Sequence, residues 1–64
     1  MTPQEQARKA EDLAGSFING DRQLVANAFG FMDKRDAVMV ALYVEEILPI
    51  SYTGAFRALL RLAI

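Results

Sequence analysis

The sequence predicts an all-α fold, a compact bundle of three to four short helices that forms a single domain over residues 1–64. Apolar residues recur at helical spacing in every segment of the chain. Residues that start and stop helices stand at the boundaries between these segments. A chain of 64 residues has room for one small domain, and its core is thin.

The first helix is expected from Pro3 to about Ile18. The sequence TPQE at residues 2–5 has the form of a capping box, with Thr2 as the N-cap, Pro3 at the first helical position and Glu5 reaching back to the Thr2 amide. Gly20 suits the left-handed backbone that ends a helix. The apolar stripe consists of Ala7, Ala10, Leu13, Ala14, Phe17 and Ile18.

The second and fourth helices show the same signals. Asp21 is expected to cap the second, and Ser51 or Thr53 the fourth. The second has apolar residues at Leu24, Val25, Ala28, Phe29 and Met32. The fourth has an apolar face made of Tyr52, Ala55, Phe56, Leu59, Leu60, Ala63 and Ile64.

The third helix is expected to begin after Asp33 as N-cap, to run to about Leu48, and to end at Pro49. Residues 37–44 carry no charge, no amide and no hydroxyl except the phenol of Tyr43. Such a run could also be a buried strand. Residues 33–48 are long enough for a helix, however, and a lone strand would have nothing to pair with. We therefore expect this helix to be the central and most buried element.

The composition predicts a homo-oligomer, most simply a dimer. The hydrophobic fraction of 53% exceeds the roughly 45–50% of typical globular domains. The chain has no cysteine, so disulfides cannot stabilise it, and association with a second copy is one remaining route. The predicted interface residues are Val38, Leu42, Phe56 and Leu60, and the predicted charged contacts to a partner are Glu45, Glu46, Arg57 and Arg61.

The residue types argue against an enzyme. With no histidine and no cysteine, and with no base beside any hydroxyl, we expect no catalytic residue, no cofactor site and no metal site. Asp33 and Asp36 could contact a hard cation, but helix capping is the simpler role because no further oxygen ligands follow at loop spacing. The chain lacks an apolar leader, and its longest uncharged apolar run is far below the ~20 residues of a membrane span, so we expect a cytoplasmic protein without a membrane partner.

Binding to nucleic acid is not favoured by the net charge of -1. The alternative function is nevertheless a small dimeric DNA-binding regulator, because LVANAFGFMDKRDAVMVAL at residues 24–42 has the outline of a degenerate helix-turn-helix. The sixth residue past the glycine packs into the core of such motifs, and here it is Asp36. A recognition helix also needs polar side chains, and residues 37–44 offer almost none. Lys34 and Arg35 could still contact phosphate.

The stretch QARKAEDLAGSFINGD at residues 6–21 resembles the opening of small uncharacterised helical proteins encoded by bacteriophages and bacterial mobile elements. The resemblance covers the first third of the chain and supplies no site residues. It implies a compact product that binds and blocks a host protein. The expected function is therefore a non-enzymatic protein–protein interaction module, a regulator or inhibitor of a host protein.

Overall fold

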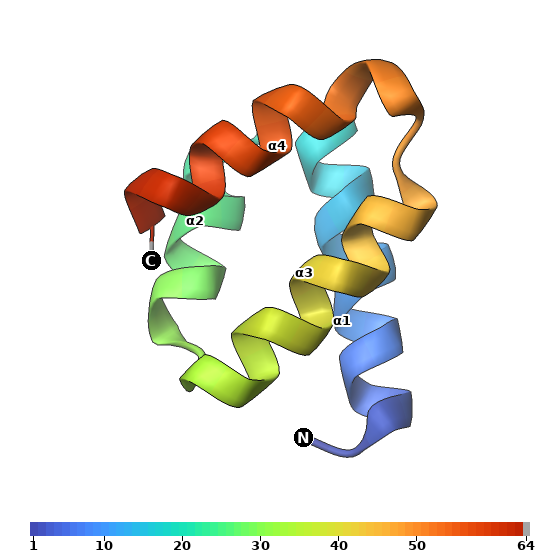
Figure 1. Ribbon diagram of the computed structural model, residues 1–64, viewed down its shortest axis with the longest axis vertical. Helices are drawn as coiled ribbons and strands as arrows, with labels where there is room; N and C mark the ends of the chain where they lie inside the picture. Colours follow the sequence, from blue (N-terminus) through green and yellow to red (C-terminus); the bar gives the residue numbers. More distant parts are fainter. Residues whose placement is uncertain (64) are drawn as a thin grey trace.

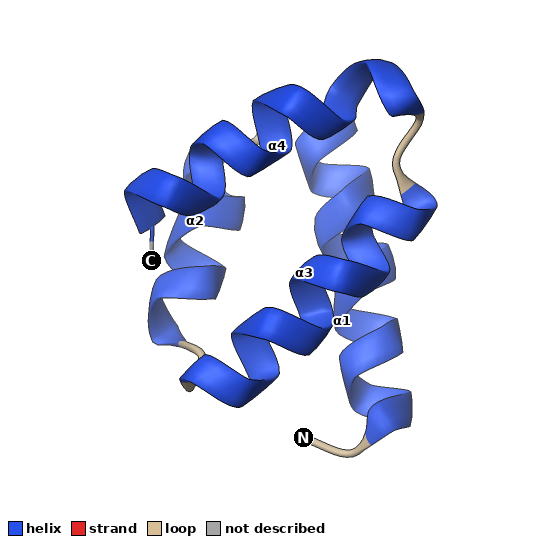
Figure 2. Ribbon diagram, viewed as in Figure 1, coloured by secondary structure: helices blue, strands red, loops and turns tan. Residues whose placement is uncertain are grey.

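The computed structural model describes residues 1–63, which form four helices and no strand (Figure 2). The helices are α1 (Pro3–Ile18), α2 (Arg22–Phe31), α3 (Lys34–Ile47) and α4 (Ile50–Ala63). The prediction of an all-α helical bundle is confirmed. Ile64, which the sequence places on the apolar face of the last helix, lies outside the described residues.

The predicted caps of α1 and α3 are present. The Glu5 amide donates to Thr2 Oγ1 at 3.2 Å, and the Thr2 amide donates back to Glu5 Oε1 at 2.8 Å. This bond from the Thr2 amide is the main reason that the pKa of Glu5 lies below its ordinary value. At the start of α3, Asp33 Oδ1 accepts from the Asp36 amide at 2.8 Å. Both helices therefore begin where their side chains satisfy free backbone amides.

The turn between α1 and α2 depends on its glycine. Gly20 has a φ of 92°, a backbone conformation that side-chain-bearing residues rarely adopt. Asp21 follows at the N-cap position of α2 as predicted, but its side chain makes no capping hydrogen bond. The turn is therefore set by the glycine rather than by the aspartate.

The predicted cap of α4 is wrong. The helix begins at Ile50, directly after Pro49, so Ser51 and Thr53 lie inside its first turn. The carbonyl of Pro49 accepts from the Tyr52 amide at 2.9 Å. A backbone acceptor thus satisfies an amide of the first turn, and no side-chain cap is needed there.

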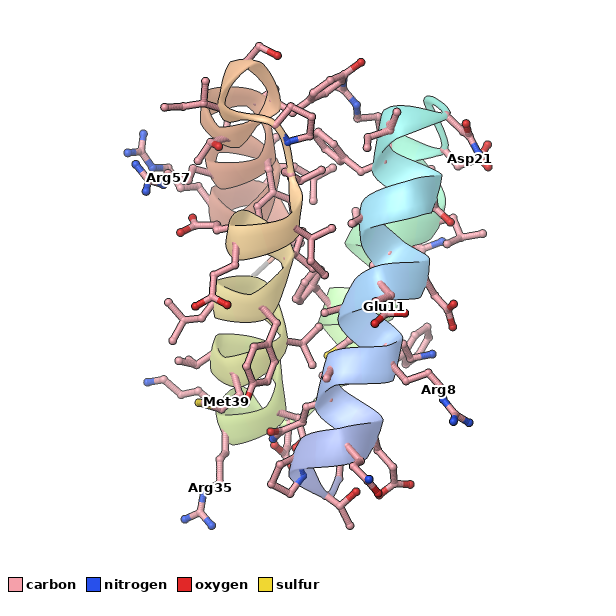
Figure 3. All side chains as sticks on the ribbon, turned by 90° about the vertical axis from the view of Figure 1, so that its right-hand side faces the viewer. Arg8, Glu11, Asp21, Arg35, Met39 and Arg57 are labelled. Carbon is pink, nitrogen blue, oxygen red and sulfur yellow. The ribbon has the colours of Figure 1, made fainter. Side chains whose placement is uncertain are left out.

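The four helices form two layers. In Figure 1, α3 and α4 lie in front of α1 and α2, and Figure 3 shows the same two layers from the side. The most extensive packing joins α1 to α3, and α2 packs on α4. The core consists of Ala10, Leu13, Ala14, Phe17, Val25, Phe29, Ala37, Val40, Val44, Leu48 and Phe56.

Aromatic rings occupy the centre of this core. The ring of Phe56 lies 5.6 Å from that of Phe17 and 5.7 Å from that of Phe29, measured between centroids. The Arg22 guanidinium lies 4.1 Å from the centroid of the Phe17 ring, a cation–π contact. One phenylalanine from α4 therefore connects both helices of the other layer.

The expectation that α3 is the most buried helix is wrong. Its buried side chains stand on one face, and α1 buries at least as many. Val38 and Leu42, in the dry run, are 50% and 51% exposed. The reason is the two-layer arrangement, which covers each helix from one side and leaves the outer side of α3 open.

The core closes within one chain. The accessible surface is 4338 Å², close to the roughly 4,100 Å² that size scaling gives for a monomer of this mass. A second copy is therefore not needed to complete the core. Within residues 1–63, no helix combines the length and the apolar character that crossing a bilayer requires.

Candidate protein-interaction surface

One face of α3 points away from the rest of the protein. We call it the α3 outer face. Its central side chains, Val38 and Leu42, lie opposite the buried Ala37, Val40 and Val44, and its charged side chains flank them. In Figure 3 it lies on the left, the side of Arg35 and away from α1. The α3 outer face consists of Lys34, Arg35, Val38, Leu42, Glu45 and Glu46.

Charge is distributed along this face in order. Two cations stand in the first turn of α3, two apolar side chains in the middle, and two carboxylates in the last turn. The apolar pair, Val38 and Leu42, is half exposed. The α3 outer face therefore has a basic end, an apolar centre and an acidic end.

The inner face of α3 holds a buried carboxylate. Asp36 Oδ1 accepts from Gln6 Nε2 at 3.1 Å and lies 3.2 Å from the amino group of Met1. The pKa of Asp36 lies below its ordinary value, first because Gln6 donates to the carboxylate and also because of the ammonium group. These bonds join α3 to α1, so Asp36 has a structural role.

This burial changes the helix-turn-helix argument. Asp36 is the sixth residue past Gly30, and its burial means that the position does belong to the interior. It therefore no longer counts against the motif. The other objection, that a recognition helix needs polar side chains, still holds. Val38 and Leu42 occupy the part of α3 where side chains that read bases would stand.

A groove separates the end of α3 from the start of α4. This α3–α4 groove is an open depression of about 750 Å³. Leu48, nearly buried, lies within it, and the exposed side chains of Leu42 and Ile50 line it from the two helices. Its lining residues are Leu42, Glu45, Glu46, Leu48, Ile50, Thr53, Gly54 and Arg57.

An ion pair crosses between the two helices at this groove. Arg57 Nε donates to Glu45 Oε2 at 2.9 Å, and Arg57 Nη2 lies 3.5 Å from Glu45 Oε1. The hydrogen bond to the Glu45 carboxylate raises the pKa of Arg57. Two of the predicted charged contacts are therefore brought together within one chain. Glu46 also lines the groove and is exposed, and Arg61 is exposed one turn further along α4.

The predicted interface residues separate into two groups. Val38 and Leu42 are exposed, and their interface role stays a prediction. Phe56 is wrong as an interface residue, because its side chain is 0% exposed and lies between two core rings. Leu60 packs partly buried against the same core, so it has little surface to offer a partner.

The basic residues do not gather on one spot. Figure 3 shows Arg35 and Arg57 at opposite ends of the layer made by α3 and α4. Arg57 is moreover paired with Glu45. Among residues 1–63, the arrangement gives no concentrated basic patch of the kind that DNA phosphates attract.

Two strongly exposed apolar residues, Ile50 and Phe31, each 92% exposed, are not among the predicted interface residues. The sequence places Ile50 between Pro49 and the predicted cap at Ser51 or Thr53, where helical spacing indicates nothing about exposure. Phe31 lies off the apolar stripe of the second helix, and that spacing could have identified it. Leu62, 91% exposed near the end of α4, lines a shallow depression together with Phe31.

No family model, no curated protein and no solved structure matches this chain. Among residues 1–63, no cluster of three or more acidic side chains could hold a metal ion.

Proposed function

We propose that this protein is a non-enzymatic interaction module that regulates or inhibits another protein by binding part of it in the α3–α4 groove. The observation that carries the proposal is the position of Ile50. Its side chain is 92% exposed and lies beside Leu42 and Leu48 in one depression. Single exposed apolar residues are ordinary, but a contiguous set in a depression is a feature of binding sites.

The surroundings of these apolar residues support the same function. Protein interfaces commonly have an apolar centre inside a polar rim. Here the rim is supplied by Glu46 and by the Glu45–Arg57 ion pair, which holds both side chains in place before a partner arrives. A partner segment with an apolar side chain for the centre and a cation for Glu46 would fit this chemistry.

The proposed context is a bacteriophage or mobile-element product that acts on a host protein in the bacterial cytoplasm. This part rests on the resemblance of residues 6–21 described above. A dimeric DNA-binding regulator is the less favoured function, since the outer surface of α3 presents Val38 and Leu42. It predicts retardation of random duplex DNA at low salt, and we expect none at tens of micromolar protein.

A capture experiment with one substitution tests the groove. Ile50→Glu places a carboxylate at the first position of α4, where the helix dipole favours negative charge, so the fold should be retained. Immobilised wild-type protein should retain a specific protein from a bacterial extract, and Ile50→Glu should lose it. Far-UV circular dichroism verifies that the variant is helical.

The matched control is Leu62→Glu, which changes an equally exposed apolar residue outside the groove. It should capture the same protein as the wild type. Capture that survives Ile50→Glu but not Leu62→Glu would place the binding site at the other end of α4 and refute the groove. A wild-type protein that retains nothing beyond what Ile50→Glu retains would refute it as well.

A further inference from the structure

We propose that the α3 outer face binds a second copy of this protein, with the two α3 helices antiparallel across a two-fold axis. This deepens the proposed interaction function by naming one partner, and it rests on that function only in treating the protein as a binding module. The argument starts from the order of charges along α3.

The face is self-complementary when it is reversed. A two-fold axis that passes beside α3 at the level of Val40 places Val38 opposite Leu42 of the second copy. Such an axis keeps each side chain on its own side of the contact, so Lys34 meets Glu45 of the second copy, and Arg35 meets Glu46. In a two-fold interface every such contact occurs twice. Two apolar contacts and four opposite-charge pairs therefore arise from one short helix.

Other arrangements of the same face lose this match. Parallel helices in register would bring Lys34 to Lys34 and Glu46 to Glu46, and like charges repel. Antiparallel α3 helices also set each positive helix end beside a negative one, in line with the helix macrodipole. The charge order therefore selects both the second copy and its direction.

The centre of the face permits close approach. Val38 and Leu42 are half exposed, so each retains apolar surface to bury, and Ala41 beside them is small. Glu45 already accepts from Arg57, so an approaching Lys34 would share that carboxylate. Glu46 makes no ion pair within residues 1–63, and its contact with Arg35 of the second copy would be new.

Sedimentation equilibrium from low micromolar to near-millimolar concentration, at low salt, tests the proposal. The wild type should pass from monomer to dimer over this range. Leu42→Glu should remain monomeric. Arg35→Glu and Glu46→Lys should each weaken dimerisation about tenfold or more, because each reversal replaces two attractive pairs with two repulsive ones.

The decisive variant carries both reversals, Arg35→Glu with Glu46→Lys. Across the two-fold axis it restores opposite charges, so its dimerisation should return toward the wild-type value. Arg8→Glu and Glu11→Lys are the matched controls, since they make the same charge changes on α1, in the other layer (Figure 3). Neither control should alter dimerisation.

Two results would overturn the proposal. One is a wild type that is monomeric throughout the range while circular dichroism shows it folded. The other is a double variant as weak as the two single reversals combined. Leu42, Glu45 and Glu46 belong to both surfaces, so the two proposals are separated at residues that belong to one surface alone: Ile50 stands outside the α3 outer face, and Arg35 stands outside the groove. Loss of capture by Ile50→Glu with normal dimerisation, or the reverse, separates the two proposals.

Discussion

The same substitution at two phenylalanines provides the sharpest test of the packing. Phe56 is 0% exposed and Phe31 is 92% exposed. Phe56→Ala removes a side chain that contacts two core rings, so we expect a loss of about 3–5 kcal/mol in the free energy of unfolding. Phe31→Ala removes a side chain with few contacts, and the loss should stay within about 0.5 kcal/mol.

These losses can be compared with the free energy of unfolding of the whole domain. A domain of 64 residues has a free energy of unfolding of roughly 3–10 kcal/mol, at about 0.05–0.15 kcal/mol per residue. Phe56→Ala should therefore leave the protein marginally stable or unfolded at room temperature. Urea unfolding followed by far-UV circular dichroism measures both variants against the wild type. Phe56→Leu, which keeps most of the apolar volume, should remain folded with an intermediate midpoint.

If Phe56→Ala and Phe31→Ala unfold at similar urea concentrations, Phe56 is not enclosed by α1 and α2, and the packing described above is refuted. A loss that falls with rising protein concentration would indicate instead that Phe56 is buried between copies, as the sequence alone suggested.

Three further predictions concern the glycines, the helix caps and the buried carboxylate of Asp36. Gly20→Ala should cost about 1–2 kcal/mol because φ is 92°, whereas Gly15→Ala, whose added methyl group meets nothing within 4 Å, should stabilise α1 by about 0.5–1 kcal/mol. Asp33→Ala should cost about 1 kcal/mol by removing a cap, and Asp21→Ala clearly less because Asp21 makes no capping bond. Urea unfolding at neutral pH measures all four, and equal effects within either pair would contradict the structure. Because the folded-state pKa of Asp36 lies below its ordinary value of 3.8, its contribution is present above that value and is lost as the pH falls further. The melting temperature should therefore drop below about pH 4, and Asp36→Asn should flatten this drop; an unchanged profile would contradict the bonding of Asp36.

Local signals predicted the fold well. The capping box at Thr2, the cap at Asp33 and the positive φ of Gly20 are each determined by a few neighbouring residues, so the sequence shows them directly. The first residue of α4 was predicted less well. Ser51 and Thr53 are the side chains suited to cap it, but the carbonyl of Pro49 accepts the hydrogen bond from the Tyr52 amide instead.

Tertiary features were harder to predict. The apolar face of the fourth helix includes more side chains than one packing surface can bury, and spacing alone does not say which of them meets the core. Phe56 was therefore assigned to an interface although it lies at the centre. Val38 and Leu42, the other two residues predicted from the third helix, are half exposed within one chain, and their interface role stays a prediction. The Glu45–Arg57 pair depends on how α4 returns past α3, which no local pattern contains.

The pairing of the helices has a consequence for how the protein can be divided. Each helix has its main packing partner two elements away, α1 with α3 and α2 with α4. A cut between Met32 and Asp33 would separate both pairs at once. Neither half would keep its principal apolar contacts, so neither should be an autonomous folding unit. If mixed halves regain helicity only together, the protein could serve as a split reporter whose reassembly signals proximity of two fused partners.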